Sequence, residues 1–260
     1  MYAFDIERPA TVAEAAAALG GDEAQALGGG QTLIPTLKQR LASPEKLVSL
    51  SGVSEMKGIT SAGGVLSIGG ATVHGDVAGD GSYKALSELA SHIGDPAVRN
   101  RGTIGGSLAN NDPSACYPAA ALASGATIVT NTREIAADDY FVDLFETALD
   151  EGEIITAVKF PIPEKASYQK FVQPASRFAL VGVFVAKASG GVRVAVTGAS
   201  NGGVYRWTAA EDALNGNFSP SALDGVNVSA DDMISDLHGS AEYRAHLVSV
   251  MTKRAVDAAS

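Results

Sequence analysis

The chain has a single cysteine, Cys116, among its 260 residues. It therefore forms no internal disulfide, and it has no ligands for an iron–sulfur cluster of its own, because such clusters use four cysteines. Its four histidines form no His-x-x-His or His-Glu-x-x-His pair, so the sequence predicts no metal site. We expect Cys116 to be a small, half-buried side chain rather than a nucleophile.

Several common signatures are also missing. No Gly-x-Gly-x-x-Gly opens a helix and no Gly-Lys-Ser/Thr ends a phosphate loop, which disfavours a Rossmann domain and an NTPase. Basic residues are scarce, with 19 Lys and Arg against 29 Asp and Glu, and the net charge of −10 disfavours nucleic acid or an anionic membrane as partner. With no signal segment and no bilayer-length apolar run, we expect a soluble, cytoplasmic protein.

Glycine, in contrast, is abundant and gathers in two turns. The first consists of Leu27, Gly28, Gly29, Gly30, Gln31, Thr32 and Leu33, and the second of Thr103, Ile104, Gly105, Gly106 and Ser107. Glycine removes the side chain that would keep a ligand away from the peptide N–H groups, and successive N–H groups form a nest for phosphate oxygens. Two nests suit a diphosphate held from two sides. The alternative is ordinary tight turns, which is how we interpret the Gly-Gly pairs at 20–21, 63–64, 190–191 and 202–203.

The residues around the two turns add to the phosphate hypothesis. Thr32 can cap a helix that has Pro35 in its first turn, and a helix N-terminus beside a glycine turn attracts anions. Neither turn ends in lysine, so the site would rely on backbone N–H groups, helped by Lys38, Arg99 or Arg101.

Hydrophobic patterning predicts an α+β protein. Strands are expected at 47–50, 66–68, 126–130 and 154–160, a hairpin at 181–188 and 192–197, and helices at 15–19, 82–93, 208–214 and 241–258. The first helix begins at the capping box Thr11-Val12-Ala13-Glu14. Along the last helix we expect the core face to be Tyr243, Leu247, Val250, Met251 and Arg254.

Five segments together resemble one family. They are the strings at 28–38 and 96–107, the opening 1–10, the stretch 175–183 and the stretch 240–247. These segments resemble the FAD-binding medium subunit of the molybdenum hydroxylases, as in xanthine and aerobic carbon monoxide dehydrogenases. The Arg101-Gly102-Thr103-Ile104-Gly105-Gly106 string is the most specific, and the resemblance covers essentially the whole chain.

The stretch Pro161-Ile162-Pro163 after the strand at 154–160 is the best candidate for a domain boundary. The resemblance implies an α+β fold with a two-part FAD-binding domain at 1–163, split near residue 57. This domain is of the type seen in vanillyl-alcohol-oxidase-like flavoproteins, and a smaller α+β domain at 164–260 follows it. FAD would be held by both glycine turns and by five further residues, and the loop carrying Arg177 and Phe178 would cover the flavin. These further residues are Asn111, Asp112, Cys116, Leu149 and Gln173.

The implied function is electron transfer within an oxidoreductase. A molybdopterin-binding large subunit and an iron–sulfur small subunit would be the partners, in a dimer of heterotrimers. Electrons would pass from the iron–sulfur clusters to FAD and then to an external acceptor. No acid–base pair or nucleophile elbow supplies substrate chemistry in this chain, and a flavin carries its own redox chemistry.

One departure from the family and two alternatives stay open. The family often has an acidic residue three positions after the proline of its Asp-Pro turn, where Cys116 stands here. The first alternative is a stand-alone FAD-dependent oxidase or dehydrogenase of the same fold. The second is a nucleotide-binding scaffold protein with no redox role.

Overall fold

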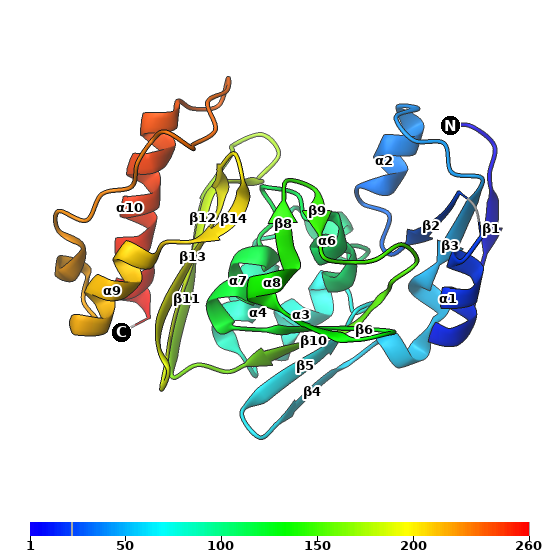
Figure 1. Ribbon diagram of the computed structural model, residues 1–260, viewed down its shortest axis with the longest axis horizontal. Helices are drawn as coiled ribbons and strands as arrows, with labels where there is room; N and C mark the ends of the chain where they lie inside the picture. The colour runs from blue at the N-terminus through cyan, green and yellow to red at the C-terminus, as the bar shows by residue number, and fades with distance from the viewer. Residues whose placement is uncertain (22, 260) are drawn as a thin grey trace.

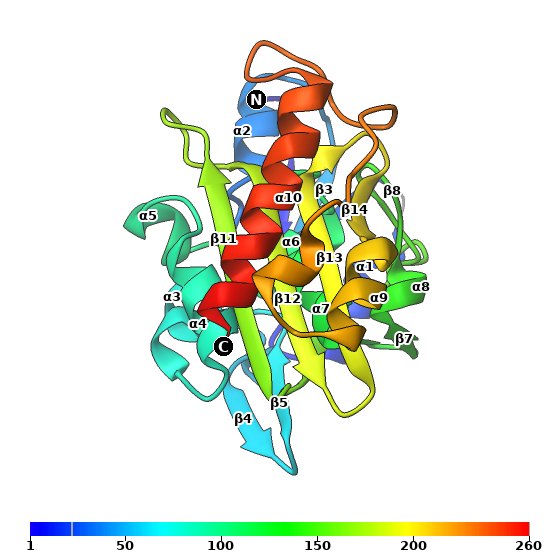
Figure 2. The same ribbon diagram turned by 90° about the vertical axis from the view of Figure 1, so that its left-hand side faces the viewer.

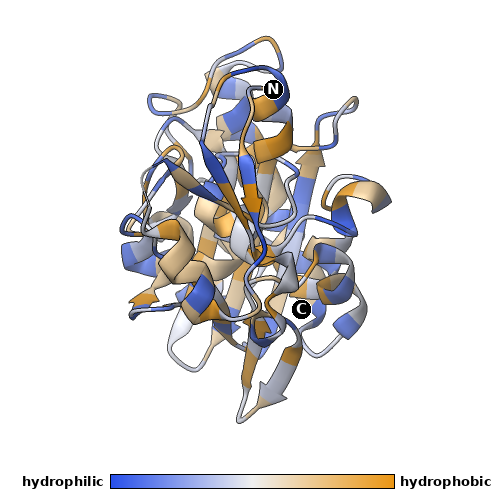
Figure 3. Cartoon of the chain, turned by 90° about the vertical axis from the view of Figure 1, so that its right-hand side faces the viewer, coloured by the Kyte–Doolittle hydropathy of each residue, from blue (hydrophilic) through white to orange (hydrophobic). Residues whose placement is uncertain are grey.

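A three-stranded parallel sheet forms the N-terminal end of the protein. The computed structural model describes residues 1–21 and 23–259. Its first strands are β1 (Asp5–Glu7), β2 (Ala24–Leu27) and β3 (Lys46–Ser49), in the order β1-β3-β2. Helix α1 (Val12–Leu19) packs against this sheet, and α2 (Leu33–Lys38) follows the first glycine turn. Figure 1 shows this unit at one end of the long axis, and Figure 3 faces it and shows hydrophilic and hydrophobic residues mixed along its elements.

The Thr11 side-chain cap of α1 is confirmed, but the reciprocal bond of the expected capping box goes to the residue before the cap. The Thr11 hydroxyl accepts a hydrogen bond from the Glu14 amide at 3.2 Å, and the Glu14 carboxylate accepts one from the Ala10 amide at 2.8 Å. Ala15 and Ala18 on this helix are buried against Val48 and Leu50. Two short 3-10 turns, η1 (Leu50–Gly52) and η2 (Ser54–Met56), then lead away from the sheet.

A five-stranded antiparallel sheet forms the middle of the molecule. Its order is β4 (Ile59–Ala62), β5 (Val65–Gly69), β10 (Ile155–Pro161), β6 (Thr127–Thr130) and β7 (Glu134–Ala136). The strands expected at 66–68, 126–130 and 154–160 all lie in it. The chain between β5 and β10 supplies the helices α3 (His74–Asp80), α4 (Lys84–Ser91), α5 (Pro96–Arg99), α6 (Ile104–Asn110), α7 (Tyr117–Ser124) and α8 (Ala137–Tyr140), and the small hairpin of β8 (Phe141–Asp143) and β9 (Glu146–Thr147).

A four-stranded antiparallel sheet follows, in the order β11 (Lys165–Val172), β12 (Ala179–Ala188), β13 (Gly191–Ser200) and β14 (Gly203–Arg206). The predicted hairpin is confirmed, because β12 pairs with β13 and Ala188 lies opposite Gly191. Figure 2 shows the outer face of this sheet covered by α10 (Ala241–Ala258), with α9 (Thr208–Gly216) and the turn η3 (Pro220–Leu223) alongside. Within the described residues, no helix is long and apolar enough to cross a membrane.

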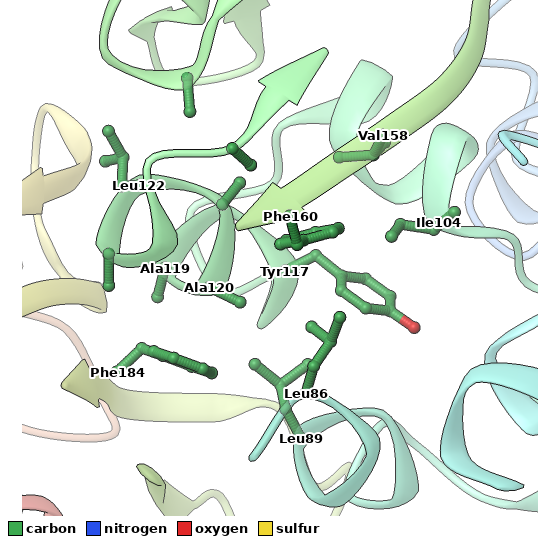
Figure 4. Close-up of a cluster of buried hydrophobic side chains, with 14 of the residues drawn as sticks. Leu86, Leu89, Ile104, Tyr117, Ala119, Ala120, Leu122, Val158, Phe160 and Phe184 are labelled. Atoms are coloured by element: carbon green, nitrogen blue, oxygen red, sulfur yellow. The ribbon is translucent and has the colours of Figure 1, made fainter. Parts of the chain in front are cut away.

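Helix α7 is buried between the two antiparallel sheets. Strand β12 alternates between two cores: Val183 and Val185 face the core under α10, whereas Phe184 and Ala186 face α7. Figure 4 shows side chains from α4, α7, β10 and β12 converging on this centre. Every residue of α7 from 117 to 123 is buried, which its small side chains permit.

The predicted core face of α10 is partly wrong. Leu247 and Met251 are buried as expected, but Tyr243 is 42% exposed and Arg254 lies on the surface. Arg244 is buried instead: its guanidinium donates to the carbonyls of Leu180 and Gly198, each at 2.8 Å, and pairs with the Asp236 carboxylate. Hydrophobic periodicity alone would not bury an arginine, and only these partners make its burial favourable.

Candidate functional site

The two glycine turns contact each other. A Cβ on Gly29 would lie 1.9 Å from the carbonyl oxygen of Arg101, and one on Gly28 would lie 3.0 Å from the Thr103 hydroxyl. A side chain at Gly29 is therefore excluded by backbone of the second turn. The first turn follows β2 of the parallel sheet and the second precedes α6 of the middle sheet, so the contact joins two parts of the fold.

In the first turn the backbone N–H groups are free. Within residues 1–21 and 23–259, the amides of Gly29, Gly30, Gln31 and Thr32 donate no hydrogen bond. Gly30 has a φ of +73°, a conformation that favours glycine. The turn thus presents a short run of unengaged donors, which is the property that an anion nest requires.

Thr32 does not cap α2 with its side chain. It occupies the residue before the helix, but its φ of −102° and ψ of −51° are already helical, and its hydroxyl makes no capping bond. A side-chain cap needs an extended backbone at that residue, so the expected cap is wrong. The carbonyl of Thr32 instead accepts from the amide and the hydroxyl of Thr36.

In the second turn the N–H groups are engaged within the chain. The amide of Ile104 donates to the Thr72 carbonyl at 3.1 Å, and that of Gly105 to the Gly70 carbonyl at 2.9 Å. The Gly106 amide donates to the hydroxyl of Thr103, which caps α6, at 3.1 Å. This turn instead exposes the backbone of Gly106. Outside the backbone of α6 itself, a Cβ on Gly106 would have one neighbour within 4 Å, the Thr103 hydroxyl.

A cavity of about 600 Å³ opens beside both turns. Most of the predicted site residues line it, namely Gly28, Gly29, Gly30, Gln31, Thr32, Leu33, Thr103, Gly105, Gly106, Ser107, Asp112 and Cys116. The loop between β11 and β12 contributes Ser176, Arg177 and Phe178 to the same wall. Segments from three parts of the chain therefore meet around one space.

Five other predicted residues are not among those that line the cavity: Leu27, Ile104, Asn111, Leu149 and Gln173. Asn111 is buried with a φ of +41°, and its amide donates to the carbonyls of Asp143 and Glu146, each at 2.9 Å. It thereby fixes the β8–β9 hairpin. The Gln173 side-chain oxygen accepts from the amides of Ala175 and Ser176 at 2.8 and 2.7 Å, which shapes the loop that reaches the cavity. Leu149 packs against the central core.

Cys116 lies at the cavity wall but is more deeply buried than expected, with 5% of its surface exposed. It precedes α7 directly, beside the buried Tyr168. Burial, with a smaller contribution from the neighbouring Cys116, raises the pKa of the Tyr168 hydroxyl well above its ordinary value. Asp112 accepts from the Ser114 amide at 2.8 Å and so stabilises the turn between α6 and α7.

Two titratable residues of the cavity wall were missed from the sequence. Glu153 accepts hydrogen bonds from Thr132, Arg133 and the Asp150 amide, and the Arg133 guanidinium is the main cause that lowers the pKa of Glu153 to about 2. His74 is 5% exposed, and burial, with a smaller effect of Arg99, lowers the pKa of His74 to about 4. Neither residue stands in a motif, since both reach the site through long-range packing.

Comparison with known proteins agrees with this geometry. Residues 2–163 match the family described as FAD binding domain in molybdopterin dehydrogenase. The chain is 32% identical to the carbon monoxide dehydrogenase medium chain of Hydrogenophaga pseudoflava, over 98% of this chain and 96% of that one. It is 34% identical to the nicotine 6-hydroxylase medium subunit of Paenarthrobacter nicotinovorans, over 95% and 94%.

Solved structures show the same fold along the whole chain. A reconstituted carbon monoxide dehydrogenase from Oligotropha carboxidovorans superposes with a TM-score of 0.90 at 32% identity, covering 99% of this chain and 98% of that one. Quinoline 2-oxidoreductase from Pseudomonas putida gives a TM-score of 0.87 at 29% identity, over 99% and 97%. With its family match, its relatives and its cavity between the two glycine turns, this chain belongs to the FAD-binding medium subunits of the molybdenum hydroxylase family.

Proposed function

We propose that this chain holds FAD in the cavity, with the diphosphate against the first glycine turn. The observation that carries the proposal is the run of unengaged amides at Gly29, Gly30, Gln31 and Thr32. Gly29 and Gly30 are half-buried and Gln31 and Thr32 are exposed, so their free N–H groups are open to a ligand, and a dianionic diphosphate would accept hydrogen bonds from several of them at once. The second turn would approach the same diphosphate with the bare backbone of Gly106 and the side chain of Ser107.

The rest of the cavity fits a flavin nucleotide. Its volume lies in the range of small-molecule sites, and Leu33, Leu50, Met56, Ile154 and Phe178 give it apolar walls on which a ring system can pack. The loop with Arg177 stands at its edge, and we propose that this loop covers the bound flavin. Asn111, Leu149 and Gln173 would act indirectly, by holding the segments around the site.

Within the family, we propose that this chain is the electron-exit subunit of a heterotrimer. Bound FAD supplies the exchange between one-electron and two-electron transfer. This chain has one cysteine, so the iron–sulfur clusters that deliver electrons would belong to a small partner subunit and molybdopterin to a large one. The carbon monoxide dehydrogenase and nicotine 6-hydroxylase relatives are named as medium subunits, which supports partners of this kind. Two such heterotrimers would form the complete enzyme, and the electrons would leave FAD for an external acceptor.

We also propose a division of labour along the chain. Residues 1–163, with a subdivision near 57, would provide the FAD-binding domain, and residues 164–260 the smaller C-terminal domain. The subdivision falls between η2 and β4, and the main boundary falls between β10 and β11. The C-terminal part would contribute the 173–178 loop to the flavin site.

The first test compares two exposed helical glycines, of which Gly106 lines the cavity and Gly79 does not. A Cβ at Gly106 would also lie 3.0 Å from the Thr103 hydroxyl, so the fold of each variant is checked by circular dichroism. Gly106→Val places a branched side chain at the exposed backbone of the second turn, whereas Gly79→Val places it in α3, where nothing lies within 4 Å. The FAD content after gel filtration is measured by absorbance. We expect Gly106→Val to lose FAD and Gly79→Val to keep it. Full FAD retention in a folded Gly106→Val variant would contradict the proposed diphosphate site.

A second test addresses the subunit role. The isolated, FAD-loaded chain is supplied with an aldehyde, a purine or carbon monoxide and an artificial electron acceptor. We expect no turnover until the cluster and molybdenum subunits are added. Steady turnover by the isolated chain would replace the subunit proposal by a stand-alone flavoenzyme.

A further inference from the structure

His74 is a buried polar side chain whose hydrogen-bonding capacity is unused. It is the first residue of α3, and its backbone amide donates a hydrogen bond of 2.9 Å to the carbonyl of Gly102, the residue just before the second glycine turn. The imidazole is 5% exposed and lines the cavity, yet its Nδ1 is buried with no partner among the described residues. The Tyr117 ring, at a centroid distance of 5.3 Å, packs beside the imidazole and restricts its orientation. Nε2 also has no hydrogen-bond partner among the described residues, and unlike Nδ1 it is not sealed from the surface, so it is the ring nitrogen that a ligand in the cavity can reach.

Gly102, which has no side chain, packs its backbone directly on one edge of this imidazole. A Cβ at Gly102 would lie 2.5 Å from His74 Nε2 and 2.8 Å from Cδ2, so any side chain there would collide with the ring. Gly102 also lines the cavity, and its Cα lies against the first turn, 2.6 Å from where a Cβ on Gly29 would stand. The imidazole edge, the bare Gly102 and the free amides of the first turn therefore follow one another along the wall.

The protonation state of the ring decides what it can do. Burial and the nearby Arg99 keep the pKa of His74 near 4, so the imidazole is neutral at neutral pH and carries one N–H. A buried N–H without an acceptor is rarer and less favourable than an unused acceptor lone pair. The proton therefore belongs on Nε2, with only a lone pair left at the sealed Nδ1.

We propose that His74 is a binding residue for the flavin nucleotide and donates a hydrogen bond from Nε2 to one of its oxygens in the cavity beside Gly102. This inference rests on the proposed function, since it takes FAD as the occupant of the cavity. The amides of the second turn donate to oxygens of the chain itself and are not free for a ligand. The His74 side chain would supply a hydrogen-bond donor beside this turn in their place. The oxygen belongs to the diphosphate or to the adjoining ribityl chain, which have the same acceptor chemistry.

Three substitutions separate the two ring nitrogens. His74→Phe keeps a planar ring and removes both nitrogens, His74→Gln places an amide N–H near the position of Nε2, and His74→Asn places one near Nδ1. The full chain, stripped of flavin, is titrated with FAD, and the dissociation constant is taken from the quenching of flavin fluorescence. We expect about a tenfold weaker binding for His74→Phe and His74→Asn, and recovery to within about threefold of wild type for His74→Gln.

Thermal melting of the flavin-free variants tests for a purely structural role. Removing an unpartnered polar group does not destabilise a core, so we expect flavin-free His74→Phe to melt no lower than wild type. Wild-type affinity in His74→Phe would overturn the inference, as would an equal loss in all three variants together with a lowered melting temperature. If His74→Phe does not fold, the contrast between Gln and Asn decides. Wild-type chain that binds no FAD would instead contradict the proposed function itself.

Discussion

The two glycine turns look alike in sequence and differ in what their backbones do. In the first, the amides of Gly29, Gly30, Gln31 and Thr32 donate to nothing within the described residues. In the second, the amides of Ile104, Gly105, Gly106 and Ser107 all donate within the chain, to the Thr72, Gly70 and Thr103 oxygens. A glycine-rich string can therefore mark a ligand nest or a tight backbone contact, and only the hydrogen bonds distinguish the two.

Gly105 of the second turn is required by the fold itself, whether or not a ligand is bound. A Cβ on Gly105 would lie 2.6 Å from the Gly70 carbonyl oxygen, which accepts the hydrogen bond of the Gly105 amide itself. Substitution there would disturb the protein even without flavin. Gly106, with its exposed backbone, is the position in this turn where loss of the cofactor can be separated from loss of the fold.

Among substitutions in the two turns and the cavity wall, we expect the largest loss of stability where the two turns contact each other. Gly29→Ala would place a methyl group 1.9 Å from the Arg101 carbonyl oxygen. Because backbone has to move, we expect the free energy of unfolding of the flavin-free chain to fall by about 3 kcal/mol. Chemical denaturation measures this. Gly79→Ala is the control, where open space in α3 should allow a gain of about 1 kcal/mol. Equal stability of the two variants would mean that the turns do not touch.

Neither turn contains a titratable side chain, so the pH dependence tested next is that of Glu153 in the cavity wall. The pKa of Glu153 is lowered from 4.5 to about 2, chiefly by Arg133. The stabilisation from its ionised form is therefore complete above pH 4.5 and is lost as the pH falls toward 2. We expect Glu153→Gln to lower the free energy of unfolding by about 2 kcal/mol at pH 7, and by progressively less below pH 4.5. A difference that stays constant from pH 7 to pH 3 would contradict the pairing.

Thr103→Val asks whether the hydroxyl in the second turn serves the fold or the ligand. The hydroxyl accepts the Gly106 amide and caps α6, so its loss should cost about 1 kcal/mol in unfolding free energy. FAD affinity should change less than about threefold, because the hydroxyl is already engaged. Calorimetry and a fluorescence titration measure the two quantities. A large loss of affinity at unchanged stability would make Thr103 a direct ligand contact.

The smallest effect is expected at Cys116. Cys116→Asp introduces a carboxylate at the cavity wall, and a negative charge disfavours reduced, anionic flavin. In the FAD-loaded chain we expect the two-electron potential to fall by about 15 mV, measured at alkaline pH so that the buried carboxyl is ionised. Cys116→Ser is the uncharged control. An unchanged potential in a folded, loaded Cys116→Asp variant would place Cys116 away from the flavin ring.

Local sequence signals predicted the elements well. The Thr11 cap of α1, the β12–β13 hairpin and the start of α10 after Ser240 all depend on residues close together in the chain. The hypothesis that two glycine nests hold one diphosphate brought the two turns to one site, and the family resemblance implied the same; both turns line the one cavity.

What the sequence could not predict depends on distant partners. The second turn loses its free amides to the carbonyls of Gly70 and Thr72, more than thirty residues earlier in the chain. Arg244 is buried because Leu180 and Gly198 offer it carbonyls. His74 belongs to the site only because Gly102 folds over it. None of these contacts leaves a local pattern.

The burial of helix α7 between two sheets has a consequence for how the protein unfolds. It has almost no solvent-facing side: one flank packs on Phe160 of the middle sheet and the other on Phe184 and Ala195 of the C-terminal sheet. Removing either sheet would expose a row of alanines with no polar face to turn to water. Although we propose a domain boundary at residue 163, the central and C-terminal parts should therefore melt in one cooperative transition. A cut between β10 and β11 would then yield two fragments that stay associated rather than two independent folding units.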